Sequence, residues 1–97
     1  MLMLITYDVN IASETGKKRL RNVAKVCIDY GQRVQNSVFE CNITPEQLIL
    51  IKEKLKKIID MDNDSIRFYN LGKNYKNKIE TLGKNNTYDA QEDVFIL

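Results

Sequence analysis

Asp8 is the residue whose type and position most strongly suggest chemistry. It follows Tyr7 near the end of LITYDVN (residues 4–10), an apolar run that predicts a buried strand. The chain contains no histidine, which excludes triads with a histidine base, paired-imidazole RNA cleavage and the usual zinc sites. Any hydrolysis would therefore depend on carboxylates and a hard metal ion. The alternative role for Asp8 is to cap the turn after the strand.

Basic side chains gather on one predicted helix. Lys17, Lys18, Arg21 and Lys25 share one of its faces, and Arg19 lies nearby. Such a face is either an ordinary solvated surface or a stripe of phosphate contacts for a nucleic acid. The overall balance, 15 Lys and Arg against 13 Asp and Glu, is too even to favour nucleic acid by itself.

Two further groups of side chains have plainer interpretations. Cys27 and Cys41 lie far apart among apolar residues, so we expect small core side chains rather than a disulfide or a reactive thiol. Asp60, Asp62 and Asp64 resemble part of a calcium loop, but the twelve-residue ligand pattern with its central glycine and terminal glutamate is missing. We expect a polar turn there.

We find no targeting or membrane signal in the sequence. The N-terminal run MLMLI is far shorter than a membrane span and lacks both a basic leader and a small-residue cleavage site. We therefore expect a cytoplasmic protein, because a reducing compartment suits two unpaired cysteines.

The first strand and helix are predicted from periodicity. Residues 2–9 are almost all apolar, which predicts a central strand covered on both faces. Ser13 or Thr15 is placed to cap a helix that begins near Lys17 and repeats apolar residues at three- and four-residue steps. Gly31 is expected to end this helix.

The next elements are a hairpin, a helix and a strand. Residues 33–43 predict two short strands around a tight turn at 35–37. Residues 44–47 (TPEQ) predict a helix start with a threonine cap, and residues 60–64 end that helix. Its expected buried face is Leu48, Ile51, Leu55, Ile58 and Ile59. Residues 65–71 alternate apolar and polar side chains, which predicts a half-buried strand.

The composition changes after residue 72. Residues 78–82 could make one short strand, and residues 83–93 have the composition of a linker. The chain closes on the apolar residues Val94, Phe95, Ile96 and Leu97. Such a tail beyond a polar stretch fits docking on a neighbouring protein better than the core of the same domain. We therefore assign residues 1–72 to the core, and residues 73–97 to a strand and tail that dock on a partner subunit.

The predicted order of elements defines a fold. Strand, helix, strand, strand, helix, strand is the ferredoxin-like βαββαβ arrangement, an α+β class in which two helices cover one face of an antiparallel sheet. A chain of 97 residues builds one such domain. Because the first strand is apolar on both faces, a second copy stacked sheet to sheet is the expected cover. We therefore expect a homodimer.

Four segments carry a resemblance to a known family. LITYDVN, KKRLRNVAKVCIDYG, GQRVQNSVFEC and SIRFYNLG resemble the small CRISPR-associated endonuclease of the adaptation complex, the Cas2 family. These segments span nearly the whole chain. The combination of YD at the end of the first strand with RVQ-S-VFE after a basic helix is more specific than any single piece.

The resemblance implies roles for particular residues. It implies a symmetric homodimer in which Asp8 of each subunit faces its counterpart, acts in catalysis and helps to bind a divalent cation, usually Mg²⁺. Two carboxylates suit magnesium better than one, because this ion takes about six oxygen ligands. The positions that match the family's motif, either as supporting residues or in packing and turn roles, are Tyr7, Arg33, Ser37 and Phe39.

The resemblance also implies partners and activity. Members of this family are metal-dependent endonucleases acting on RNA or double-stranded DNA, and they bridge two integrase dimers that capture new spacer DNA. We favour the scaffold as the physiological role: the basic helix face follows a DNA duplex and residues 94–97 contact the integrase. The alternative is a stand-alone ribonuclease toxin of similar fold.

Overall fold

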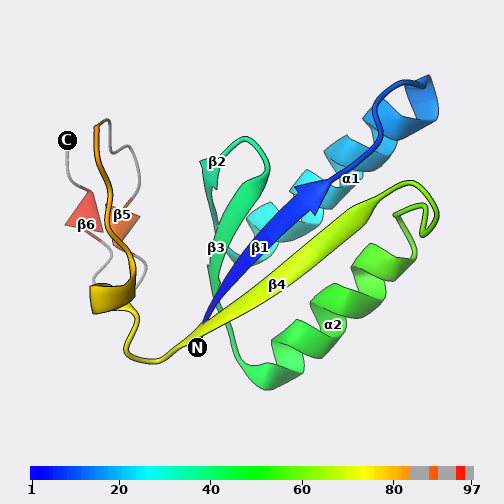
Figure 1. The fold of residues 1–97 in the computed structure, drawn as a ribbon. Coiled ribbons are helices and arrows are strands. Elements are labelled where there is room, and N and C mark those ends of the chain that lie inside the picture. The colour runs from blue at the N-terminus through cyan, green and yellow to red at the C-terminus, as the bar shows by residue number, and fades with distance from the viewer. Residues whose placement is uncertain (84–87, 90–93, 96–97) are drawn as a thin grey trace.

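The computed structural model describes residues 1–83, 88–89 and 94–95 (Figure 1). Within residues 1–83 the elements are β1 (Leu2–Asp8), α1 (Glu14–Tyr30), β2 (Gln32–Gln35), β3 (Val38–Asn42), α2 (Pro45–Lys56), β4 (Ser65–Gly72) and the 3₁₀ turn η1 (Lys76–Lys78). This order confirms the predicted βαββαβ arrangement.

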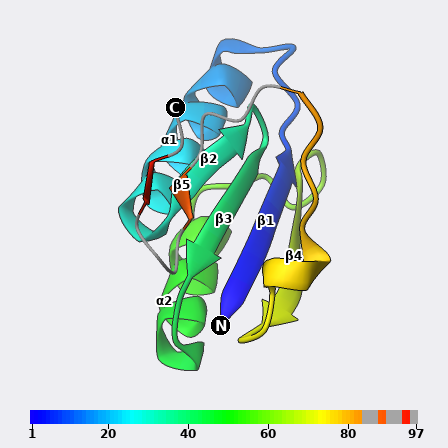
Figure 2. The same ribbon diagram turned by 90° about the vertical axis from the view of Figure 1, so that its left-hand side faces the viewer.

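The strands β1 to β4 form one antiparallel sheet in the spatial order β2-β3-β1-β4. β1 pairs with both β3 and β4, so it is the central strand that its apolar sequence predicts. Figure 2 shows the sheet from the side opposite the helices, with α1 and α2 behind it. The structure is therefore ferredoxin-like.

Alternate residues of β1 lie on the two faces of the sheet. Met3, Ile5 and Tyr7 are buried in the core between the sheet and the helices. Leu4 and Thr6 are half-buried on the opposite face, where Asp8 is exposed. We call this second surface the open face. Within one chain it is only partly covered, which is the condition that led us to expect a second copy.

Helix α1 begins at Glu14, three residues before the predicted start. Ser13 is its N-cap, because the main-chain amide of Gly16 donates a 3.1 Å hydrogen bond to the Ser13 hydroxyl. Gly16 also lies so close to Asn10 that a Cβ atom at this position would collide with the Asn10 carbonyl group. The first turn of α1 is therefore packed directly on the loop that follows Asp8.

Gly31 ends α1 for a different reason from the one predicted. Its backbone is extended, with φ −167° and ψ −157°, rather than left-handed. A Cβ atom on Gly31 would collide with the carbonyl oxygen of Glu40 and with Cys41. A glycine is needed here because β3 passes close to the chain.

Helix α2 has the predicted cap. The Gln47 amide donates to the Thr44 hydroxyl at 3.2 Å, and the Thr44 amide donates to the Gln47 side-chain oxygen at 3.0 Å. The helix ends at Lys56, earlier than the turn at residues 60–64. Ile58 and Ile59 lie beyond the helix but still pack against the core, as their spacing predicts.

The region after β4 differs from the prediction. Residues 79–82 form no strand within the described chain and run along the open face, opposite the helices (Figures 1 and 2). With Leu4, Val38 and Leu71 they border a groove of about 710 Å³. The expected linker, residues 83–93, contains the strand β5 (Tyr88–Asp89), which pairs with β6 (Val94–Phe95).

The tail prediction lies partly outside the structure. Val94 and Phe95 form β6, whereas Ile96 and Leu97 lie outside the described residues, as do residues 84–87 and 90–93. Docking of this tail on a partner subunit stays a prediction.

Candidate functional site

Asp8 is the last residue of β1, and its side chain is exposed. On one side, Asp8 is paired with Ser65 of β4. On the other side, the pairing of β1 with β3 ends two residues earlier, at Thr6 and Val38. The carboxylate therefore stands at the corner of the open face, beyond the end of β3. Within residues 1–83 no hydrogen bond or ion pair joins this carboxylate to another side chain or to the main chain. Its oxygens remain accessible to an external ligand.

A single chain does not supply a complete metal site in its described part. Among those residues, no group of three or more His, Cys, Asp or Glu side chains could hold a metal ion. Asp8 alone provides one carboxylate, whereas Mg²⁺ takes about six oxygen ligands, of which one or two are commonly carboxylates and several are waters. A second copy of Asp8 would supply a second carboxylate and leave waters as the remaining ligands.

The four predicted supporting residues lie together beside Asp8. Tyr7 is buried, its ring stacks on Phe39 at a centroid distance of 5.9 Å, and the Arg33 guanidinium lies 5.2 Å from the centre of the Phe39 ring. The Tyr7 hydroxyl donates to the main-chain oxygen of Asn36 at 3.0 Å, and the Tyr7 amide donates to that of Ser37 at 3.1 Å. These contacts join the end of β1 to the turn between β2 and β3.

Two roles were predicted for Tyr7, Arg33, Ser37 and Phe39: support of the chemistry, or packing and turn formation. Their contacts have the geometry of packing and turn formation. Tyr7 points into the core, away from the open face on which Asp8 lies. Phe39 is fully buried, so a nucleic acid has no access to its ring. These contacts hold the strand end that carries Asp8, and a supporting role in the chemistry stays a prediction.

The predicted basic residues of α1 fall into two groups. Lys17, Lys18, Arg21 and Lys25 are exposed, and Lys17 makes a surface ion pair with Glu14 at 3.4 Å. We call these four residues the basic strip. α1 begins shortly after Asp8, so the first basic residues lie at the same end of the sheet as this carboxylate (Figure 1).

Arg19 differs from the basic strip. Its Nε donates a 2.8 Å hydrogen bond to the carboxylate of Asp64, and its side chain is only 19% exposed. A guanidinium held in this way by a buried carboxylate is directed into the protein. The structure therefore gives Arg19 an internal partner in place of the predicted phosphate contact.

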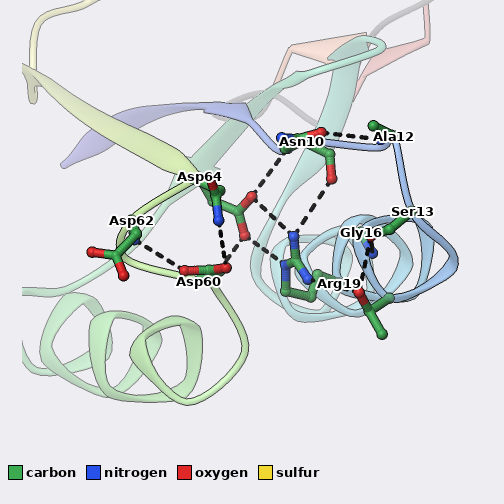
Figure 3. A network of polar contacts seen from close by, with 10 residues as sticks. Asn10, Ala12, Ser13, Gly16, Arg19, Asp60, Asp62 and Asp64 are labelled. Atoms are coloured by element: carbon green, nitrogen blue, oxygen red, sulfur yellow. Dashed lines mark hydrogen bonds and ion pairs between the residues drawn. The ribbon is translucent and has the colours of Figure 1, made fainter.

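Asp64 is the important residue that the sequence reasoning missed. It was placed in a polar turn, but its carboxylate is fully buried and accepts hydrogen bonds from three segments of the chain (Figure 3). Besides Arg19, the donors are the main-chain amides of Asn10, at 3.0 Å, and Asp60, at 2.8 Å. One aspartate in a run of polar residues does not indicate burial. Its position directly before a strand was a signal that its side chain could accept hydrogen bonds from main-chain amides.

The electrostatics of Asp64 follow from these contacts. Burial alone would raise the pKa of its carboxyl group, but the hydrogen bond from Arg19 and those from the two amides outweigh it, so the pKa is lowered. Asp64 is thus held as a carboxylate that completes the ion pair with Arg19.

Cys27 and Cys41 are free and buried, as predicted. Burial raises the pKa of the Cys27 thiol to about 12 and that of Cys41 to about 11, so neither is a nucleophile at neutral pH. In the described part of the chain, no helix has the length and apolar character required to cross a membrane.

Curated proteins of known family resemble this chain over nearly its full length. The chain is 53% identical over 92 residues to the CRISPR-associated endonuclease Cas2 of Halalkalibacterium halodurans, covering 95% of this chain and 96% of that protein. It is 48% identical over 91 residues to the CRISPR-associated endoribonuclease Cas2 of Nitratidesulfovibrio vulgaris, covering 94% and 89%.

Solved structures agree with the sequence relatives. The crystal structure of Streptococcus pyogenes Cas2 at pH 6.5 superimposes with a TM-score of 0.78 at 61% identity, covering 86% of this chain and all of that one. A second crystal structure, described as cas2, has a TM-score of 0.70 at 31% identity and covers 92% and 93% of the two chains. The family described as CRISPR associated protein Cas2 matches residues 1–79. The chain therefore belongs to the Cas2 family of CRISPR-associated proteins.

Proposed function

We propose that this protein is a CRISPR-associated, metal-dependent endonuclease whose homodimer also serves as the DNA-binding scaffold of spacer acquisition. The observation that carries the proposal is the exposed carboxylate of Asp8 at the corner of the open face, which has no hydrogen-bond or ion-pair partner among residues 1–83. The names of the relatives, an endonuclease and an endoribonuclease, support phosphodiester hydrolysis. Membership of the Cas2 family favours this function over the ribonuclease toxin.

The residues present fit a divalent cation when two copies are combined. The open face is only partly covered in one chain, and a second open face stacked on it would bury Leu4 and Val38 and bring together residues near the axis. In such a dimer Asp8 of both subunits would hold Mg²⁺, with waters as the remaining ligands. When held there, the cation would supply Lewis-acid chemistry, namely a more acidic bound water and a polarised phosphodiester.

The chain's own residues bind and orient the nucleic acid in this proposal. The basic strip presents four cations on one side of α1, a pattern that neutralises successive backbone phosphates. Such contacts are independent of base sequence, which suits both a nonspecific nuclease and a scaffold. Residues 94–97 would contact the integrase that the scaffold bridges.

A heterodimer tests the shared metal site. Wild-type and Asp8→Asn subunits with different tags are mixed, the heterodimer is isolated through both tags, and Mg²⁺-dependent cleavage of RNA and duplex DNA is measured. A cation held jointly predicts that the heterodimer is almost as inactive as the Asp8→Asn homodimer. Independent subunits would leave about half of the activity, because one intact site remains. A monomeric wild-type protein would also overturn the proposal.

The scaffold role requires a separate test. We expect the full chain to co-purify with the integrase of the same system, and a variant that lacks residues 94–97 to lose this association while still cleaving RNA. Retention of the truncated chain by the integrase would contradict the role of the tail.

A further inference from the structure

The buried carboxylate of Asp64 ties together the two chain segments that flank Asp8. One segment is the loop after β1, whose Asn10 amide donates to Asp64 at 3.0 Å. The other is the start of β4, where Asp64 itself immediately precedes Ser65, the residue paired with Asp8. Both strand ends beside Asp8 are thus held by one acceptor (Figure 3).

Arg19 extends this connection to the basic helix. Its Nε and one terminal nitrogen contact the Asp64 carboxylate, at 2.8 and 3.5 Å, while the same terminal nitrogen lies 3.5 Å from the main-chain oxygen of Asn10. A guanidinium suits this arrangement because its donors form a rigid planar fork. Asn10 is therefore held at its amide by Asp64 and at its carbonyl group by Arg19.

We propose that Asp64 and Arg19 are positioning residues that fix the carboxylate of Asp8 for the cation. This inference rests on the proposed metal-binding role of Asp8. Magnesium requires near-ideal octahedral geometry, so a ligand on an unsupported strand end binds it poorly. Groups hydrogen-bonded to a metal ligand typically change metal affinity about 10- to 100-fold when they are removed. Asp64 and Arg19 reach Asp8 through the main chain of Asn10, and we expect an effect of the same order.

A role confined to stability makes a different prediction. A buried ion pair that merely holds the fold together changes the free energy of unfolding when it is broken. It leaves the affinity of the folded molecule for the cation unchanged. The experiment must therefore measure cation binding at Asp8 in protein that is shown to be folded.

Mn²⁺ is the probe, because it broadens the NMR signals of nearby nuclei. The full-length protein is titrated with Mn²⁺, and the half-saturation concentration is read from broadening of the Asp8 and Val9 amide signals. The variants are Asp64→Asn, Arg19→Gln and Arg19→Lys. Asp62→Asn is the matched control, because it makes the same substitution in the same turn at an exposed position.

We expect wild type and Asp62→Asn to share one half-saturation concentration. Asp64→Asn and Arg19→Gln should raise it about 10- to 100-fold, and Arg19→Lys, which keeps the charge without the fork, should fall between. Folded variants that bind Mn²⁺ as wild type does would overturn the inference. If Asp64→Asn does not fold, the half-saturation concentrations of the two Arg19 variants test the inference.

Hydrogen exchange gives an independent measurement on the metal-free wild-type protein. The Asn10 amide lies in a loop, yet its hydrogen bond to Asp64 predicts exchange as slow as that of strand amides. Rapid exchange would show that the connection is not maintained in solution and would overturn the inference. If Mn²⁺ broadens no Asp8 signal in wild type, the proposed metal function itself fails. If Mn²⁺ broadens the Asp8 signal in wild type and the variants have the same half-saturation concentration, only the positioning role of Asp64 and Arg19 fails.

Discussion

The ring of Tyr7 stacks on the ring of Phe39, with centroids 5.9 Å apart and planes 25° from parallel. Tyr7 is the neighbour of Asp8 in sequence, but it lies on the other face of the sheet, within the core. The pair links β1 to β3 at the point where their pairing ends. We therefore expect Tyr7 to support Asp8 through packing rather than through contact with a substrate.

Tyr7→Phe tests this packing role. The variant loses the hydrogen bond that the hydroxyl donates to Asn36 and the longer one that it accepts from Arg33, but it keeps the ring stack. We therefore expect urea denaturation to show a loss of about 1 kcal/mol. Mg²⁺-dependent cleavage should remain close to the wild-type rate. For comparison, Phe39→Ala should lower the free energy of unfolding by about 3–5 kcal/mol, because the Phe39 side chain is fully buried. A folded Tyr7→Phe protein without cleavage would instead give the hydroxyl a part in the chemistry.

Asp8→Asn separates the enzyme from the scaffold. Its side chain is exposed and makes no hydrogen bond or ion pair with the described residues, so the free energy of unfolding should change by no more than about 0.5 kcal/mol. Cleavage should be lost, whereas spacer acquisition in cells should persist if the scaffold is the physiological role. Loss of acquisition in a variant that is folded and dimeric would make cleavage essential to the pathway.

Charge reversal tests the basic strip. Lys18→Glu combined with Arg21→Glu should weaken binding to duplex DNA and reduce the slope of log affinity against log salt, by about 0.9 for each phosphate contact that is lost. The control, Lys56→Glu with Lys57→Glu, makes the same change of charge at the end of α2 and should keep the wild-type slope. Equal slopes for both variants would show that net charge alone affects binding, and would contradict phosphate contacts by the basic strip.

Much of the fold followed from local rules that the sequence displays. The Thr44 cap, the alternation in β4 and the apolar β1 were predictable because each depends on residues close together in the chain. The position of Gly31 was predicted but not its cause, since the close approach of β3 is a tertiary contact. The strand predicted at residues 78–82 could not be judged from one chain, because a strand requires a partner to accept its hydrogen bonds.

The candidate site was predictable only in part. Asp8 was singled out because a carboxylate at the end of an apolar strand is unusual, and it was preferred over a turn cap because of the resemblance to the Cas2 family. Its role in catalysis and metal binding stays a prediction. The exposed members of the basic strip followed from helical spacing. Arg19 was grouped with them because spacing cannot show which cation has a buried partner. That partner, Asp64, lies 45 residues away in the chain, so the pair exists only once the fold has formed.

The two cysteines should be inert in the native protein. Burial raises the pKa of both thiols well above neutral pH, and neither sulfur is exposed to a reagent. At pH 8 we expect a thiol-reactive dye to label native protein slowly, at the rate of unfolding. In urea, two thiols per chain should react at once. Fast labelling without denaturant would show that the region between α1 and β3 opens locally.

Acid should weaken the fold through Asp64. Burial acts to raise the pKa of its carboxyl group, but the hydrogen bonds from Arg19 and from the Asp60 and Asn10 amides lower it overall. A carboxyl group with a lowered pKa in the folded state stabilises the protein above its unfolded pKa of about 3.9. This stabilisation is lost as the pH falls from that value through the folded pKa. Urea denaturation at pH 7, 5, 4 and 3 and fixed protein concentration should therefore show a falling free energy of unfolding. The Asp64→Asn variant should be less stable than wild type at pH 7 but should lose less on acidification, whereas Asp62→Asn should follow wild type. The same pH dependence in Asp64→Asn and wild type would assign the acid sensitivity to other carboxylates.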